Sequence, residues 1–251
     1  MCVPMERFKN VLSVTDDARI NVLLNHFDQI CRRYGIEYMM DGGALVGSML
    51  HHDRIPWDDD IDVYVRLTDR RRLTQKLQRN GFVVGSNGKY SKLWSVTFPH
   101  IANNRQWNWP FIDIGWLVQN ATHSWEQRSV EKRYMRHVYP SGWLFPPVLR
   151  PFGELVLSAP RQSERVLEYR FGHDWSRMCV VNHWNHKLEN WRYNNSHENT
   201  RLLCDILNVN LVHRVSFKNG TSFEWLVNHR TGYRGVVREF PITSRPTYKF
   251  L

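Results

Sequence analysis

The sequence predicts an α+β protein in which helices flank a small mixed β-sheet and a basic β-hairpin segment follows near the C-terminus. Helix-like and strand-like apolar spacings alternate through the first half of the chain. In the second half, Asn219-Gly220 lies between two strand-like stretches, and this dipeptide favours the tight turn of a hairpin. The 251 residues are 42% hydrophobic and 13% aromatic, which is enough to form a core and excludes a disordered chain.

Three helices and three strands are expected to alternate before residue 120. Apolar residues at helical spacing predict the first helix, with Thr15 or Asp16 as its cap and Gly35 as its end. These apolar residues are Ile20, Leu23, Leu24, Phe27, Ile30 and Tyr34. The elements that follow are a strand at 36–40, a helix at 44–50, a strand at 61–65, a helix at 68–80 and a strand at 111–118. On the last strand, alternation places Asp113 on the face opposite the apolar residues.

Prolines at positions 146, 147, 151 and 160 predict loops at the start of the second half. A short helix is expected at 163–171. Strands at 211–217 and 221–227 flank the Asn219-Gly220 turn and complete the predicted hairpin.

Positive charge is concentrated towards the C-terminus. The chain has 34 Lys and Arg against 24 Asp and Glu, a formal charge of +10, and five of these ten net charges lie from Arg201 onward. Such a surface favours an anionic glycan, membrane or nucleic acid, and the alternative is a solvated face that only aids solubility. The basic residues expected to be available are Arg214, Lys218, Arg230, Arg234 and Arg238.

The cysteine pattern and the apolar runs exclude several classes of protein. No run approaches the roughly 18 apolar residues of a membrane-spanning helix, and the first ten residues contain no signal-peptide core. Cys2, Cys31, Cys179 and Cys204 lack CxxC spacing, which argues against a zinc knuckle and a dense disulfide framework. We therefore expect free thiols, with one disulfide in an oxidising compartment as the alternative.

The segment at 55–63, IPWDDDIDV, carries the strongest chemical signal. It places four carboxylates in five positions, and because like charges repel, a compensating cation is expected. Asp60 and Asp62 share one face of a strand and offer the oxygen ligands that Mg²⁺ or Mn²⁺ prefers. If the strand at 111–118 is a neighbour, Asp113 completes a cluster of three carboxylates. Upstream, Gly42-Gly43 precedes a helix and allows a phosphate to approach its backbone N–H groups.

The run from Met40 to Val63, MDGGALVGSMLHHDRIPWDDDIDV, resembles the LicD family. This family of phosphotransferases has a nucleotidyltransferase fold and includes bacterial phosphocholine transferases and eukaryotic fukutin-type ribitol-phosphate transferases. Weaker similarities follow at Lys92-Leu93, Ile112-Asp113 and 169–175. The resemblance implies a catalytic domain at 1–191, with 192–251 as a basic extension whose hairpin packs on the same domain.

The resemblance further implies transfer of a choline- or ribitol-phosphate group from a CDP-linked donor to a glycan hydroxyl, with Mg²⁺ or Mn²⁺ as cofactor. Asp60 and Asp62 are expected to bind the metal and catalyse transfer, and Asp113 completes the metal shell or accepts the proton of the attacking hydroxyl. The nucleotide- and phosphate-binding candidates are Gly42, Gly43, Trp57, Asp59 and Lys92. Packing is the alternative for Trp57, loop shaping for Asp59 and solvation for Lys92. Weaker substrate-binding candidates are His52, Arg54 and His186.

Two other functions stay open at this point. A nucleotidyltransferase that moves the nucleotide itself would use the same carboxylates. A non-catalytic protein that binds polyanions on the same fold would account for the net charge, although no RNA-binding motif is visible. The expected location is the cytoplasm for a complete chain and the Golgi lumen for a fragment of an anchored protein.

Overall fold

The computed structural model describes residues 5–86, 91–99, 106–127, 137–182, 184–192, 199–216 and 221–241. Its centre is a seven-stranded mixed sheet in which β1, β2, β5, β4 and β3 follow one another, β6 pairs with the end of β5, and β7 pairs with β6. These strands are β1 (Tyr38–Asp41), β2 (Asp62–Arg66), β3 (Phe82–Ser86), β4 (Ser91–Ser95), β5 (Ile112–Gln119), β6 (His123–Glu126) and β7 (Val138–Pro140). Within this sheet β2 and β5 are parallel and the other described pairs are antiparallel, which confirms the predicted α+β class with a mixed sheet.

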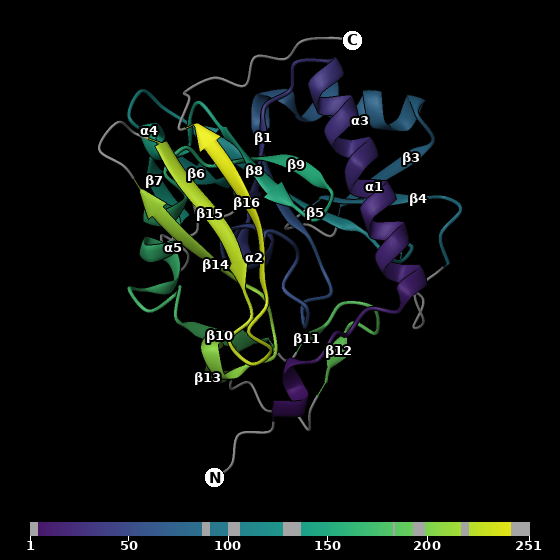
Figure 1. Ribbon diagram of the computed structural model, residues 1–251. Helices are drawn as coiled ribbons and strands as arrows, with labels where there is room; N and C mark the ends of the chain where they lie inside the picture. The colour runs from purple at the N-terminus through teal and green to yellow at the C-terminus, as the bar shows by residue number, and fades with distance from the viewer. Residues whose placement is uncertain are drawn as a thin grey trace.

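The helices lie around this sheet (Figure 1). They are η1 (Met5–Phe8), α1 (Val14–Arg33), α2 (Gly42–His51), η2 (Leu67–Asp69), α3 (Arg70–Arg79), α4 (Ser141–Leu144), α5 (Ser163–Phe171) and η5 (Cys204–Ile206). α1 is capped by Ser13, two or three residues before the expected caps, because the Ser13 hydroxyl accepts a hydrogen bond from the Asp16 backbone N–H at 3.1 Å. α2 begins at Gly42 rather than at residue 44, so the expected glycine turn is the first turn of the helix.

The main core lies between α1, α2 and the sheet. The predicted apolar face of α1 is buried, with Leu23, Leu24 and Phe27 at most 1% exposed. Burial of each such side chain stabilises the fold by about 1.5–3 kcal/mol. A second, smaller cluster joins Phe8 and Trp57 to β10 and η5. The loop that leads into β2 contributes Ile61 to the main core and Ile55 and Trp57 to the second cluster, so both clusters anchor it.

The second half of the chain is more ordered than its prolines suggest. It contains β8 (Val148–Phe152), β9 (Leu155–Ala159), β10 (Met178–Val181), β11 (Trp184–Asn185), β12 (Asn190–Trp191), β13 (Thr200–Leu203), β14 (Leu211–Ser216), β15 (Thr221–Val227) and β16 (Arg234–Pro241). The expected loop around Pro151 is instead the antiparallel pair β8–β9, where the Pro151 carbonyl accepts a hydrogen bond from the Ser48 hydroxyl at 2.8 Å. The loop prediction was wrong there, because β8 lies at the edge of a two-stranded sheet and an edge strand tolerates a proline.

The C-terminal strands form a three-stranded antiparallel sheet, β14-β15-β16, drawn in yellow-green and yellow in Figure 1. The predicted hairpin is present as β14 and β15, which pair from Leu211↔Val227 to Ser216↔Ser222. Its Asn219-Gly220 turn, with Phe217 and Lys218, lies outside the described residues. The third strand was not predicted. Arg214, expected to be available to a partner, is instead bonded to Glu224 and Glu164.

A disulfide joins Cys179 of β10 to Cys204 of η5. The expectation of free thiols is therefore wrong for this pair, and the alternative of one disulfide applies. Cys31 is free and buried, and Cys2 lies outside the described residues. Sequence spacing could not reveal the pair, because 25 residues separate its members and only the β10–β13 pairing brings them together. Among the described residues, no helix has the length and apolarity needed to cross a membrane.

Candidate active site

Four charged residues form a row across the central sheet. The strand register places Asp41 opposite Asp62, Asp62 opposite Asp113, and Lys92 opposite Asp113. The parallel pairing of β2 and β5 thus makes Asp113 the direct neighbour of Asp62, as the sequence analysis required for a three-carboxylate cluster. Acidic side chains from the neighbouring strands β1, β2 and β5 are therefore brought together at one end of these strands.

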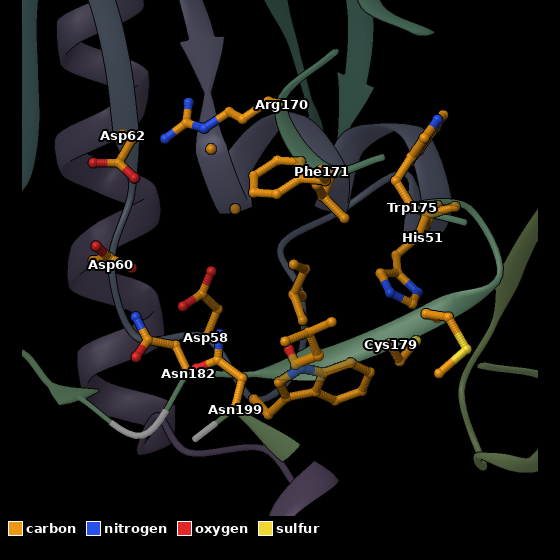
Figure 2. Close-up of a pocket in the computed structure, with 18 of the residues that line it drawn as sticks. His51, Asp58, Asp60, Asp62, Arg170, Phe171, Trp175, Cys179, Asn182 and Asn199 are labelled. Carbon is orange, nitrogen blue, oxygen red and sulfur yellow. The ribbon is translucent and has the colours of Figure 1, made fainter. Parts of the chain in front are cut away.

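A cavity of about 620 Å³ opens beside Asp62 and Asp113 of this row. Figure 2 shows Asp62 at one end of this cavity. One end is acidic and contains Asp58, Asp60, Asp62 and Asp113 beside the glycines that begin α2. Its lining further includes Val46, Leu50, His51, Ile55, Trp57, Arg170, Phe171, Asp174, Trp175, Met178, Cys179, Val180, Asn182, His186, Asn199 and Arg201. Such a volume accommodates a nucleotide-sized ligand.

The acidic cluster has the chemistry of a site for a hard divalent cation. Asp60, Asp62 and Asp113 each offer a carboxylate oxygen, and these atoms lie within 4.8 Å of one another. Burial, reinforced by neighbouring carboxylates, raises the pKa values of Asp60 and Asp62 well above the usual range of aspartate. Burial and the charge of Asp59 raise the pKa of Asp58 to about 6. Each shift indicates that the ionised carboxylate is unfavourable in this buried, acidic setting, a cost that a bound cation would offset.

The two glycines at the start of α2 let these carboxylates approach the helix backbone closely. A Cβ atom on Gly42 would lie 2.8 Å from Asp62 Oδ2, and one on Gly43 would overlap Asp58 Oδ2. Gly42 has a φ of +51°, which favours glycine, whereas Gly43 has no such requirement. The backbone N–H groups of this first helical turn can therefore be approached closely by an anion.

We expect Gly43→Ala to reduce activity at least about tenfold with little loss of stability, because displacement of a positioned group of this kind is costly for catalysis. The added Cβ must push the Asp58 carboxylate aside, but no backbone strain arises at this position. Gly35→Ala is the matched control: Gly35 has a φ of +59° and no atom near its Cβ position. This variant should lose about 1 kcal/mol of stability and keep its specific activity. Equal activity in both variants would show that the close approach of Asp58 to Gly43 is not needed for activity.

Lys92 lies behind the acidic cluster rather than in the cavity. Its ammonium group is 3.0 Å from both oxygens of Asp113 and 3.5 Å from the centre of the Phe111 ring. Lys92 is buried and does not line the cavity, so the alternative of a solvated lysine does not apply. Its position indicates that it holds the Asp113 carboxylate in place.

Asp59 belongs to a buried network next to the cluster. Asp59 Oδ1 lies 2.8 Å from His186 Nδ1 and 2.7 Å from the Arg192 guanidinium, and Asp59 Oδ2 accepts a hydrogen bond from the His186 backbone. The other ring nitrogen, His186 Nε2, lies 3.1 Å from Asp60 Oδ2. Burial disfavours a charged imidazole, but Asp60 and Asp59 outweigh it and raise the pKa of His186 to about 10. Both Asp59 oxygens are thus engaged, and His186 orients Asp60.

Trp57, His52 and Arg54 are held by the protein itself. The Trp57 indole donates to the Val180 carbonyl at 2.9 Å and packs against Phe8, although its ring borders the cavity. His52 Nε2 lies 2.7 Å from the buried Glu224 carboxylate. Arg54 pairs with Asp17 of α1 at 2.5 Å. Neither His52 nor Arg54 lines the cavity, so the structure does not bring them to the other candidates. His183, noted in the sequence beside His186, lies outside the described residues.

Several residues that the fold brings to the site were not predicted from the sequence. Asp41 ends β1 and pairs with Arg170 of α5, which borders the cavity. Arg192 holds Asp59, and Asn182, Asn199 and Trp175 line the cavity far from the acidic run in sequence. The segment at 169–175 carried a signal, namely its weak family similarity, but the sequence did not indicate that it faces the carboxylates.

Three known proteins are similar to parts of this chain. The lipopolysaccharide cholinephosphotransferase LicD of Haemophilus influenzae is 46% identical over 50 residues, which are 20% of this chain and 19% of LicD. The human ribitol 5-phosphate transferase FKRP is 30% identical over 145 residues, which are 55% of this chain and 28% of FKRP. The chain thus covers less than a third of the length of these relatives. The lincosamide adenylyltransferase LnuA has a TM-score of 0.37 and 16% identity, covering 65% of this chain and 89% of LnuA.

The family match spans the elements that build the site. Residues 35–162, just over half of the chain, match the LicD/FKTN/FKRP nucleotidyltransferase domain. This range includes the glycines of α2, the acidic loop, β2, β4 and β5, whereas Arg170, His186 and Arg192 lie outside it. The chain therefore belongs to the LicD/FKTN/FKRP family of nucleotidyltransferase domains.

Proposed function

We propose that the protein is a Mg²⁺-dependent phosphotransferase that moves a choline- or ribitol-phosphate group from a CDP-linked donor to a glycan hydroxyl. The observation that carries this proposal is the convergence of Asp60, Asp62 and Asp113 at one end of a cavity large enough for a nucleotide. Family membership supports the reaction type, since the names of two relatives describe transfer of phosphocholine and of ribitol 5-phosphate.

The residues fit the proposed metal, because three clustered carboxylates, one buried and two half-buried, are the oxygen donor set that a hard cation prefers. Asp60, Asp62 and Asp113 would hold Mg²⁺ or Mn²⁺. When bound, the ion would neutralise charge on the donor phosphates and on the leaving nucleotide. Lys92 fixes the orientation of Asp113, and His186 fixes that of Asp60. Lys92 contacts both Asp113 oxygens, which favours a role for Asp113 in the metal shell over proton transfer.

The remaining lining supplies binding surface around the reacting group. The first turn of α2 presents N–H groups to a phosphate, and the aromatic and amide side chains opposite can position the nucleoside and the acceptor. A thermal-shift screen with CDP-choline, CDP-ribitol and CMP tests this assignment. We expect the CDP-alcohols to raise the melting temperature more with Mg²⁺ than without it. An absence of stabilisation by any CDP-alcohol would contradict the proposed donor.

The stability gained from Mg²⁺ should increase with pH. The raised pKa values of Asp58, Asp60 and Asp62 mean that the folded metal-free protein retains protons that the unfolded chain releases. Its stability is therefore lost as pH rises from about 4 through 6 and above, where repulsion grows. Because metal ligands must be deprotonated, Mg²⁺ should raise the melting temperature more at pH 7.5 than at pH 5. The same increase at both values would argue against carboxylate ligands.

A further inference from the structure

We propose that Arg170 binds the diphosphate of the donor, between the start of α2 and Asp62, in the role that the sequence suggested for Lys92. This inference rests on the proposed function, because it assigns a ligand group to the same cavity. It concerns a residue outside the range that matches the family.

The position of Arg170 places a guanidinium beside the acidic cluster. Arg170 lies near the end of α5, and Figure 2 shows its side chain reaching towards Asp62 over the acidic end of the cavity. The point where a Cβ atom on Gly42 would lie is 2.8 Å from Asp62 Oδ2 and 3.6 Å from Arg170 Nη2. Gly42 therefore has a candidate metal ligand on one side and a cation on the other. A phosphate at this end of the cavity, which Gly42, Asp62 and Arg170 all line, would meet both.

Among the described lining residues, Arg170 and Arg201 are the two that carry a permanent positive charge. Arg201 pairs with Asp174 at 2.7 Å, and both side chains are about half exposed. In the described contacts, neither Arg201 nor Asp174 touches Asp60, Asp62 or Asp113. Lys92 is enclosed by Asp113 and aromatic rings. His186 also lines the cavity, but its two ring nitrogens already contact Asp59 and Asp60. Among the described lining residues, Arg170 is thus the cation beside the acidic cluster that can still bind a ligand.

The guanidinium retains donors for a ligand. Arg170 Nη1 donates to Asp41 Oδ1, and the described residues show no other hydrogen bond from this side chain, whose exposure is 18%. A guanidinium carries five N–H donors in a planar fork, which matches two phosphate oxygens. Asp41 orients the fork from the side of β1. Without such a cation, the surrounding carboxylates would repel a diphosphate electrostatically.

The test compares binding of inorganic pyrophosphate, in the presence of Mg²⁺, with binding of cytidine by calorimetry. Arg170→Gln should weaken pyrophosphate binding about 10- to 100-fold, the usual cost of losing charge-assisted hydrogen bonds, and leave cytidine affinity unchanged. The pyrophosphate affinity of Arg170→Lys should lie between those of the wild type and Arg170→Gln, because lysine keeps the charge but loses the planar arrangement of donors. Arg201→Gln is the control: it removes an equal charge from the same cavity and should leave pyrophosphate affinity within about twofold of wild type.

Arg170→Gln also leaves the buried Asp41 without its partner and is expected to lower stability. The double variant Arg170→Gln with Asp41→Asn removes both charges and should recover stability without recovering pyrophosphate binding. Recovery of binding in the double variant, an unchanged affinity in Arg170→Gln, or no binding of pyrophosphate by the wild-type protein would each overturn the inference. Pyrophosphate binding through Arg170 without transfer from CDP-alcohols would refute the proposed donor and leave this phosphate site standing.

Discussion

Replacing Asp62 with asparagine is expected to abolish transfer while leaving the fold intact. Asp62 has cluster neighbours on both sides, Asp60 along the chain and Asp113 across the strand pair. Losing one of three carboxylates should cost the site several kcal/mol of transition-state stabilisation. At 1.36 kcal/mol per factor of ten, the rate should fall at least about 10³-fold. Asp60→Asn should behave in the same way.

The same substitution should raise the melting temperature of the metal-free protein. Burial and the charges of Asp60 and Asp113 raise the pKa of Asp62, so its ionised form is unfavourable in the folded state. An amide of the same shape removes this repulsion, and the gain should be larger at pH 7.5 than at pH 5. Asp205→Asn, which removes an exposed charge, serves as the control and should change neither property. Near-wild-type turnover of Asp62→Asn would refute the metal assignment.

Replacing Glu224 with glutamine should be the most destabilising of the substitutions considered. Glu224 is fully buried in β15, and its carboxylate contacts His52 Nε2 at 2.7 Å, Arg150 Nη1 at 2.8 Å and the Arg214 guanidinium. His52 ends α2 and Arg150 lies in β8, so one side chain ties the C-terminal sheet to two core elements. Loss of its charge removes the carboxylate that pairs with the buried Arg150 and should lower the free energy of unfolding by about 3–5 kcal/mol.

Glu164→Gln is the matched control for this prediction, because Glu164 also bonds to Arg214 but its side chain is 63% exposed. An exposed pair of this kind should cost less than about 1 kcal/mol. Burial opposes ionisation of Glu224, yet the bonds from His52 and Arg150 outweigh it and lower its pKa to about 2. The stabilisation is therefore present above pH 4.5 and is lost as pH falls from there towards 2. Urea titrations of both variants that agree within error would show that the network does not hold the sheet.

Short sequence patterns were sufficient to predict the strands and the helix start that carry the acidic cluster. The alternation of apolar residues with Asp62 and with Asp113 predicted the two strands. The expectation that Asp60 shares a strand face with Asp62 was wrong, because β2 begins at Asp62 and Asp60 lies in the loop before it. The parallel β2–β5 register then brought Asp62 and Asp113 together as expected. The glycine pair predicted a helix start close to the acidic run, and the contacts at Gly42 and Gly43 agree with that proximity.

The ion partners could not be predicted, because each comes from a distant part of the chain. Arg170 meets Asp41 across 129 residues and His52 meets Glu224 across 172, and no periodicity encodes such pairs. The partner of Lys92 could not be predicted either. Its sequence position indicated a cation near the site, but only the β4–β5 register shows that it faces Asp113. Charge counts in the C-terminal segment likewise overlooked that Arg214 is bonded to Glu224 and Glu164.

The measurement that tests the proposed reaction most directly is ³¹P NMR of the protein incubated with CDP-ribitol or CDP-choline, a glycan acceptor and Mg²⁺. Phospho-alcohol transfer predicts a growing CMP signal and a new phosphodiester on the glycan, both abolished by EDTA and by Asp62→Asn. A nucleotide attached to the acceptor would instead assign the cavity to nucleotidyl transfer. Donor signals that stay unchanged in the presence of Mg²⁺, with every acceptor tried, would contradict the account.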